Sequence, residues 1–343
     1  MKKWLVVLLV SLFGLGIAIT GSQSKEQEGK RKELPASRHY VLRLGIEHGP
    51  DHPYTQVMKR YSKLVSQKTN GDVEIKLYPS AQLGSAPEMI EGLQIGSIDL
   101  LLTAPAYYRS QIPEMDVLII PFLIENAEHY ERVMAGKVGE FITARLAKSG
   151  FINLAYYYGG MREFTNNRKP INTLDDMKGL KMRVPGLPVI IKCFEKFGIL
   201  ATPVPFSDLY TALQTGMVDA QENPVAQIYD SKFFEVQKYL SLSDHQVTPV
   251  GLVISQTSFE KLPAEYQKAL RKAAEEAVPW NRDNFWKVEK ETLAKLKAKG
   301  MQVNKIRDKE SFKKAVEPLY VEIPKMIGKK DVGWILDEVK KCK

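Results

Sequence analysis

From residue 40 onward, the chain alternates between two kinds of apolar period, and this alternation limits the folds open to it. Residues 40–46 carry apolar side chains at every second position, as in a half-buried strand. Pro53 then opens a segment with apolar residues three and four positions apart, as in a helix, and Gly71 closes it. Residues 73–78 alternate again. Strands that alternate with helices predict an α/β fold with a mainly parallel sheet covered on both faces.

The rest of the chain continues this pattern. Ser85 and Glu88 form a possible capping box at the start of a helix. Pro263 opens a long helical stretch. The strand-like segments of the second half are 152–158, 181–184, 202–205 and 247–255. A chain of 343 residues is long enough for about two domains, each with its own core.

The N-terminus has the composition of an export signal. Lys2 and Lys3 precede an apolar run over residues 4–19, and no further charge appears until Lys25. As a helix the run would reach about 24 Å, less than the ~30 Å hydrocarbon core of a bilayer. We therefore predict a signal peptide over residues 1–24 and a periplasmic or extracytoplasmic location, with an uncleaved anchor as the alternative. Residues 25–39 are charged and lack an apolar period, which indicates a flexible, solvated tether.

Composition and missing motifs exclude several classes of function. The net charge is +9, but the basic residues are scattered along helices without interleaved aromatic residues, which argues against nucleic-acid binding. Hydrolase, metalloprotease and phosphate-loop motifs are missing, so the sequence nominates no enzyme, metal or cofactor. His48, Asp51 and His52 form one metal-like cluster. Two prolines interrupt this cluster, which favours a strand-end loop lining a cleft over a metal site.

The chain has two cysteines, Cys193 and Cys342, which lie 149 positions apart. This spacing excludes a short disulfide framework of the kind that stabilises small exported domains. Two unpaired thiols are the favoured interpretation, and a single long-range bridge stays open.

Four segments carry a more specific signal. They are Leu77 to Ser85 (LYPSAQLGS), Gly159 to Asn167 (GGMREFTNN), Gly179 to Pro185 (GLKMRVP) and Phe206 to Pro224 (FSDLYTALQTGMVDAQENP). Their order and spacing closely resemble the solute-binding proteins of tripartite ATP-independent periplasmic (TRAP) transporters, the DctP-type family. The resemblance covers about residues 40–340, and Ala220 departs from it where the family often has glycine.

The resemblance implies a two-lobed periplasmic binding protein fold in which strands and a long helix span both lobes. Lobe I would comprise residues 40–159 and 249–288, and lobe II residues 160–248 and 289–343. The lobes would close on an organic acid, and the protein, a monomer, would deliver this ligand to the membrane subunits of a TRAP permease.

The resemblance also implies roles for individual residues. Arg183 would make a bidentate salt bridge to the ligand carboxylate, Arg162 would add a second charge-assisted contact, and Asn223 would fix the carboxylate from the other side. Further contacts to the ligand body, to its hydroxyl groups and in a specificity-setting stretch are implied for Phe206, Glu47, His48, Pro105 and Tyr107. The chemistry agrees, because a planar guanidinium matches a carboxylate with two parallel hydrogen bonds.

Two further candidates have weaker support. Tyr210 lies on the helix that follows Ser207 and equally suits a core position, and His245 could simply bond a backbone carbonyl. The ligand class also stays open. Hydroxyl-bearing acids such as uronates and aldonates are favoured, while C4-dicarboxylates and keto acids remain alternatives. A periplasmic enzyme or a sensory binding protein acting on a carboxylate would need the same cleft.

Overall fold

The computed structural model describes residues 39–327 and 332–343. The predicted signal peptide and residues 25–38 of the predicted tether therefore lie outside the described residues. Among the residues that are described, no helix is both long enough and apolar enough to cross a membrane.

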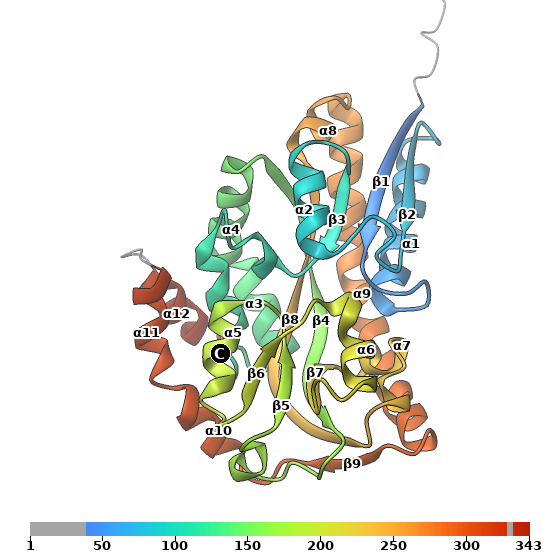
Figure 1. The fold of residues 1–343 in the computed structure, drawn as a ribbon. Helices are drawn as coiled ribbons and strands as arrows, with labels where there is room; N and C mark the ends of the chain where they lie inside the picture. The colour runs from blue at the N-terminus through green and yellow to red at the C-terminus, as the bar shows by residue number, and fades with distance from the viewer. Residues whose placement is uncertain (1–38, 328–331) are drawn as a thin grey trace, which may run out of the picture. The chain divides into compact units, whose positions relative to one another are not determined.

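A mixed sheet of nine strands organises the described part of the chain (Figure 1). The strand order is β2-β1-β3-β8-β4-β7-β5-β6, and β9 pairs with β8. The strands are β1 (Tyr40–Ile46), β2 (Val73–Tyr78), β3 (Leu100–Thr103), β4 (Phe151–Asn166), β5 (Lys181–Val184), β6 (Leu200–Pro203), β7 (Ala220–Pro224), β8 (Tyr239–Ser255) and β9 (Gln302–Lys305).

The sheet is less uniformly parallel than the sequence predicted. The groups β2-β1-β3 and β7-β5-β6 are parallel internally. The long strands β4 and β8 lie between these groups, and they pair antiparallel with each other and with β7 and β3. β8 pairs with β3 of the first group and β4 pairs with β7 of the second, so the pairing of these two strands, 17 and 16 residues long, joins two α/β lobes into one continuous sheet.

Helices cover the sheet, and their starts follow the predicted signals. The capping box is present, with Glu88 accepting hydrogen bonds from the backbone N–H and hydroxyl of Ser85 at 2.7 and 2.8 Å. Pro53 begins α1, and Pro263 precedes α9, which runs beside both lobes (Figure 1). The helices are α1 (Pro53–Lys68), α2 (Ala86–Gln94), α3 (Ala127–Ala135), α4 (Lys137–Lys148), α5 (Pro188–Glu195), α6 (Leu209–Gln214), α7 (Val225–Asp230), α8 (Gln256–Glu260), α9 (Ala264–Ala298), α10 (Lys309–Val316), α11 (Leu319–Ile327) and α12 (Val332–Lys341).

The pairing of β4 with β8 is irregular where the strands pass between the lobes. The register shifts between Tyr158 and Met161 and again between Arg162 and Phe164. Gly160 has a φ of 95°, a conformation that residues with a Cβ rarely adopt. The Tyr54 hydroxyl donates a 2.7 Å hydrogen bond to the carbonyl of Gly159 and so ties α1 to this segment.

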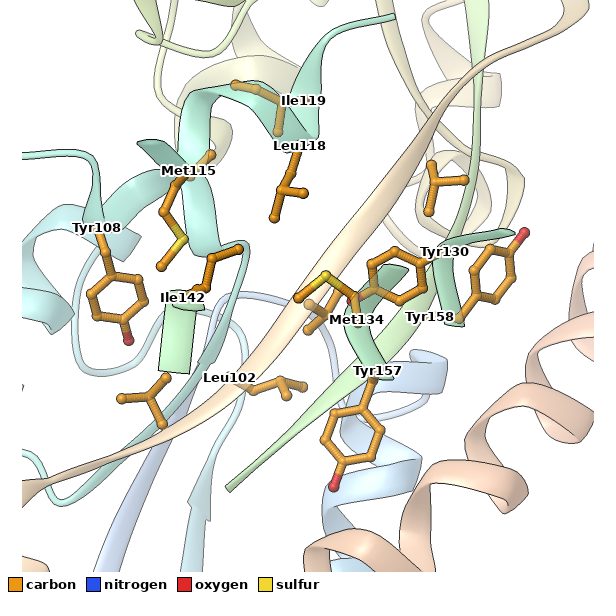
Figure 2. Packing of buried hydrophobic residues seen from close by; sticks show 14 of the residues in the cluster. Leu102, Tyr108, Met115, Leu118, Ile119, Tyr130, Met134, Ile142, Tyr157 and Tyr158 are labelled. Atoms are coloured by element: carbon orange, nitrogen blue, oxygen red, sulfur yellow. The ribbon is translucent and has the colours of Figure 1, made fainter. Parts of the chain in front are cut away.

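Aromatic and branched side chains from several elements fill the core beside β4. Figure 2 shows Tyr157 of β4 near Tyr130 and Met134 of α3, and Ile142 of α4 near Met115. The C-terminal helix closes this region, because the ring of His129 in α3 bonds the carbonyl of Val339 in α12 at 2.7 Å. Cys193 is buried and Cys342 is partly buried, and both are free thiols.

Candidate functional site

A small enclosed cavity of about 80 Å³ lies where strands of both lobes end. The loop after β1 and the segment after β3 reach it from one lobe, and β5 and β7 reach it from the other. Such strand ends are the usual ligand position in open α/β sheets. The polar side chains that line it are Glu47, His48, Tyr54, Thr103, Tyr107, Arg162, Arg183, Glu222, Asn223, Gln227, Gln246 and Thr248. Apolar walls come from Leu102, Ile119, Leu187, Ile190, Phe206 and Val250.

Arg162 is neutralised by a carboxylate of the protein itself. It lies opposite Pro224 in the β4–β7 pairing, so Glu222, two residues earlier, shares its face of the sheet. The Nε of Arg162 donates to one carboxylate oxygen of Glu222, and Nη2 donates to the other at 2.8 Å. Nη2 also donates to Oδ1 of Asn223 at 2.9 Å. This bidentate ion pair uses most of the guanidinium's donors before any ligand arrives.

The pair shifts the pKa of both partners. Burial favours neutral forms, but the mutual attraction outweighs it: the pKa of Arg162 is raised, and that of Glu222 is lowered to about 2. His245 supports the pair from behind, because its Nε2 lies 3.3 Å from Glu222 and its Nδ1 lies 2.8 Å from the Ser243 hydroxyl. Its ring stacks on Phe164 at 4.3 Å. His245 therefore positions Glu222.

Arg183 differs from Arg162 in how its charge is compensated. Its side chain is buried, with the residue 2% exposed, yet no Asp or Glu within the described ranges forms an ion pair with it. Within residues 39–327 and 332–343 its one hydrogen bond runs from Nε to the carbonyl of Val204 at 2.9 Å. Burial lowers the pKa of Arg183, because the charged form is poorly solvated. The two terminal nitrogens remain available to a partner in the cavity.

The loop after β1 supplies two further ionisable groups. Glu47 accepts a hydrogen bond from the Ala86 N–H, at the start of α2, at 3.0 Å, and burial raises its pKa. Burial lowers the pKa of His48 to about 4, against the opposing effect of the Gln227 side chain, so the ring is neutral at pH 7. His48 also stacks on Phe206 from the other lobe, with ring centroids 5.6 Å apart.

The structure brings together seven of the ten side chains that the sequence nominated. They are Glu47, His48, Tyr107, Arg162, Arg183, Phe206 and Asn223. Pro105, Tyr210 and His245 do not line this cavity. The Tyr210 hydroxyl instead bonds Glu235 at 2.8 Å on an exposed face, since α6 turns that side chain outward. His245 is fully buried behind Glu222.

Sequence reasoning missed several cavity residues. Glu222 is the most important, and the signal was its charge inside an otherwise buried strand. Tyr54, Gln227, Gln246 and Thr248 also line the cavity. Thr248 falls in the predicted strand 247–255 and Gln246 directly precedes it, and the Oε1 of Gln246 is buried without a hydrogen-bond partner among the described residues.

The chain is similar to known solute-binding proteins over most of its length. The DctP model, described as bacterial extracellular solute-binding protein, family 7, matches residues 44–325. The 2,3-diketo-L-gulonate-binding periplasmic protein YiaO of Escherichia coli is 35% identical over 275 residues, which cover 80% of this chain and 84% of that protein.

Solved structures give the same result. The sugar acid binding protein DctPAm of Advenella mimigardefordensis, in complex with galactonate, superposes with a TM-score of 0.86 at 32% identity, covering 89% of this chain and 99% of that one. A TRAP periplasmic solute binding protein of Polaromonas, bound to D-erythronate, has a TM-score of 0.83 at 35% identity, covering 87% and 98%.

Proposed function

This chain belongs to family 7 of the bacterial extracellular solute-binding proteins, and on that premise we propose that its cavity binds the carboxylate of a sugar acid through Arg183. The ligand would be captured outside the cytoplasm by a monomeric protein and delivered to the membrane subunits of a TRAP permease. The proposed activity is reversible binding and not catalysis.

The unpaired charge of Arg183 is the observation that carries the proposal. A buried guanidinium without an anion carries a desolvation cost that the fold alone does not offset. A carboxylate in the cavity could accept hydrogen bonds from both terminal nitrogens in the fork geometry that arginine favours. Arg162 is already held by Glu222, so Arg183 is the cation that an incoming anion would contact.

The remaining polar groups support a hydroxylated ligand. The carboxyl group of Glu47 and the side-chain oxygen of Gln246, which has no partner among the described residues, can both accept hydrogen bonds. Ligand hydroxyl groups are suitable donors to both. Phe206 and Ile190 offer apolar surface to the carbon skeleton. Galactonate and D-erythronate in the related structures have this combination of one carboxylate and several hydroxyl groups.

We also propose that the ligand is enclosed by lobe closure, with lobe I at residues 40–159 and 249–288 and lobe II at 160–248 and 289–343. Two contacts across the proposed boundary support this division. The Gly49 N–H donates to Asp230 at 3.1 Å, and His48 stacks on Phe206. The irregular pairing of β4 with β8 at Tyr158 to Phe164 would let the sheet bend at the boundary.

The proposal is tested by calorimetry with a panel of aldonates, uronates and keto acids. We expect at least one sugar acid to bind, and Arg183→Ala to weaken binding by about 2–5 kcal/mol. Tyr210→Phe serves as the matched control and should leave the affinity unchanged, since Tyr210 lies outside the cavity. Unchanged affinity in Arg183→Ala would remove the basis of the proposal. Recovery of the bound acid in chemically altered form would instead favour an enzyme.

A further inference from the structure

We infer that the cavity admits ligands with one carboxylate and rejects those with two, and that Glu47 sets this limit. The inference rests on the proposed function and names the ligand class more closely. It follows from how the ionised groups around the cavity are already paired.

Two arginines and two carboxyl groups line the cavity. Arg162 and Glu222 neutralise each other in the bidentate pair. The other two, Arg183 and Glu47, do not touch, although each lies within the electrostatic field of the other. The only cation of the lining without a carboxylate partner among the described residues is therefore Arg183, since His48 is neutral. One ligand carboxylate is enough to pair with it, and with Glu47 ionised the site then carries one net negative charge.

The first carboxylate of a ligand has a defined binding position at Arg183. The terminal nitrogens of Arg183 have no hydrogen-bond partner in the part of the chain that the structure describes, so two charge-assisted hydrogen bonds can form there without breaking one of those contacts.

A second carboxylate would find no equivalent position. The Nε and Nη2 of Arg162 are used by Glu222 and Asn223, and Nη1 faces the Thr248 hydroxyl at 3.4 Å. A second ligand charge would have to displace Glu222 or remain unpaired in a buried site, and both are strongly unfavourable.

Glu47 strengthens this discrimination. It is held toward the cavity by the Ala86 N–H, and when ionised it can only accept hydrogen bonds. A ligand hydroxyl near Glu47 can donate to it, whereas a ligand carboxylate there would repel it across a short, poorly screened distance. The position beside Glu47 therefore favours a ligand hydroxyl group and disfavours a second ligand carboxylate.

Matched acids that differ at one terminal carbon test this inference. Galactonate is compared with galactarate, and D-erythronate with meso-tartrate, because each second acid has a carboxylate in place of the terminal CH₂OH. The monoacid that binds more tightly is compared with its own diacid. We expect calorimetry at pH 7 to show that this diacid binds at least 100-fold more weakly, and this factor is the selectivity ratio. Glu47→Gln keeps an oxygen that can accept the Ala86 hydrogen bond, and it should reduce that ratio about tenfold or more.

Glu91→Gln is the control, since Glu91 is exposed on the same helix that Glu47 contacts. It should leave the ratio unchanged. Equal binding of mono- and diacids by the unmodified protein would overturn the charge limit and leave the proposed function intact. An unchanged ratio in Glu47→Gln would overturn the part assigned to Glu47. Failure of all four acids to bind would count against the sugar-acid proposal and against this inference with it.

Discussion

Glu222 and Arg162 form a bidentate ion pair on neighbouring strands, so the charge of Arg162 is compensated within the protein. Both arginines border the same cavity, and sequence alone gave them similar roles. Glu222 neutralises Arg162, whereas neither terminal nitrogen of Arg183 has a hydrogen-bond partner among the described residues. In the proposed function the two guanidinium groups therefore differ: Arg162 would stabilise the site, and Arg183 would bind the ligand.

Replacing Arg183 should separate stability from binding. In Arg183→Met, an unpaired buried charge is exchanged for an apolar side chain of similar length, so the ligand-free protein should gain about 1–2 kcal/mol of stability. Ligand binding should be lost. Thermal unfolding with and without the acid measures both effects. Arg183→Lys keeps the charge without the fork and should bind with intermediate affinity, and a less stable ligand-free Arg183→Met protein would contradict this account.

Removing the Glu222 charge should be strongly destabilising. Glu222→Gln leaves Arg162 buried without its anion, a change that typically costs about 3–5 kcal/mol. Denaturant unfolding at pH 7 measures the loss. Arg168→Gln, which disturbs the more exposed ion pair of Arg168 with Asp219, is the control and should cost about 1 kcal/mol or less.

The same pair predicts an acid dependence of stability. The pKa of Glu222 is lowered to about 2 in the folded protein, so its contribution is fully present above about pH 4.5, the ordinary glutamate value, and is lost as the pH falls toward 2. The linked contribution is about 3 kcal/mol. Unfolding measured between pH 5 and pH 2 should show this loss in the unmodified protein. If Glu222→Gln folds, an equally steep loss in that variant would show that other groups cause it.

Glu289 predicts the opposite dependence at higher pH. Its carboxyl group lies against Gly160, and burial raises its pKa to about 8. The unfolded chain ionises this group near pH 4.5, so the free energy of unfolding should fall as the pH rises from 4.5 to 8, by up to about 1.4 kcal/mol per pH unit. Glu289→Gln should remove this slope. If the unmodified protein and Glu289→Gln lost stability equally between pH 4.5 and pH 8, Glu289 would not be the group that causes the slope.

Gly159 should be intolerant of any side chain. A Cβ at this position would lie 2.3 Å from the Tyr54 hydroxyl and 2.7 Å from the carbonyl oxygen of Thr248. We expect Gly159→Ala to cost more than about 2 kcal/mol, and Tyr54→Phe, which loses one hydrogen bond, about 1 kcal/mol. Because Tyr54→Phe removes one of the clashing atoms, the double variant should lose less stability than the sum of the two. Strict additivity in denaturant unfolding would argue against the contact.

Local structure was largely predictable from the sequence, because its signals are local. The apolar periods located β1, α1 and β2, and the capping box located the start of α2. The direction of β4 and β8 was not predictable, since an alternating pattern reads the same in parallel and antiparallel strands. The motifs identified Arg162 but not its partner, because Glu222 lies 60 positions later and only the pairing of β4 with β7 brings them together. The place of Tyr210 was not predictable for a related reason: its neighbours in the sequence do not show that its hydroxyl bonds Glu235 outside the cavity.

The position of β8 has a consequence for how the protein folds. This strand pairs with β3, β4 and β9, so residues 239–255 complete both lobes at once. Neither lobe can close its sheet until a late segment of the chain has been made and has found partners up to about 150 positions earlier. Contacts of such high sequence separation slow folding. We therefore expect the nascent chain to remain without its native sheet until most of it has been synthesised, and a chain truncated before β8 to yield no folded lobe.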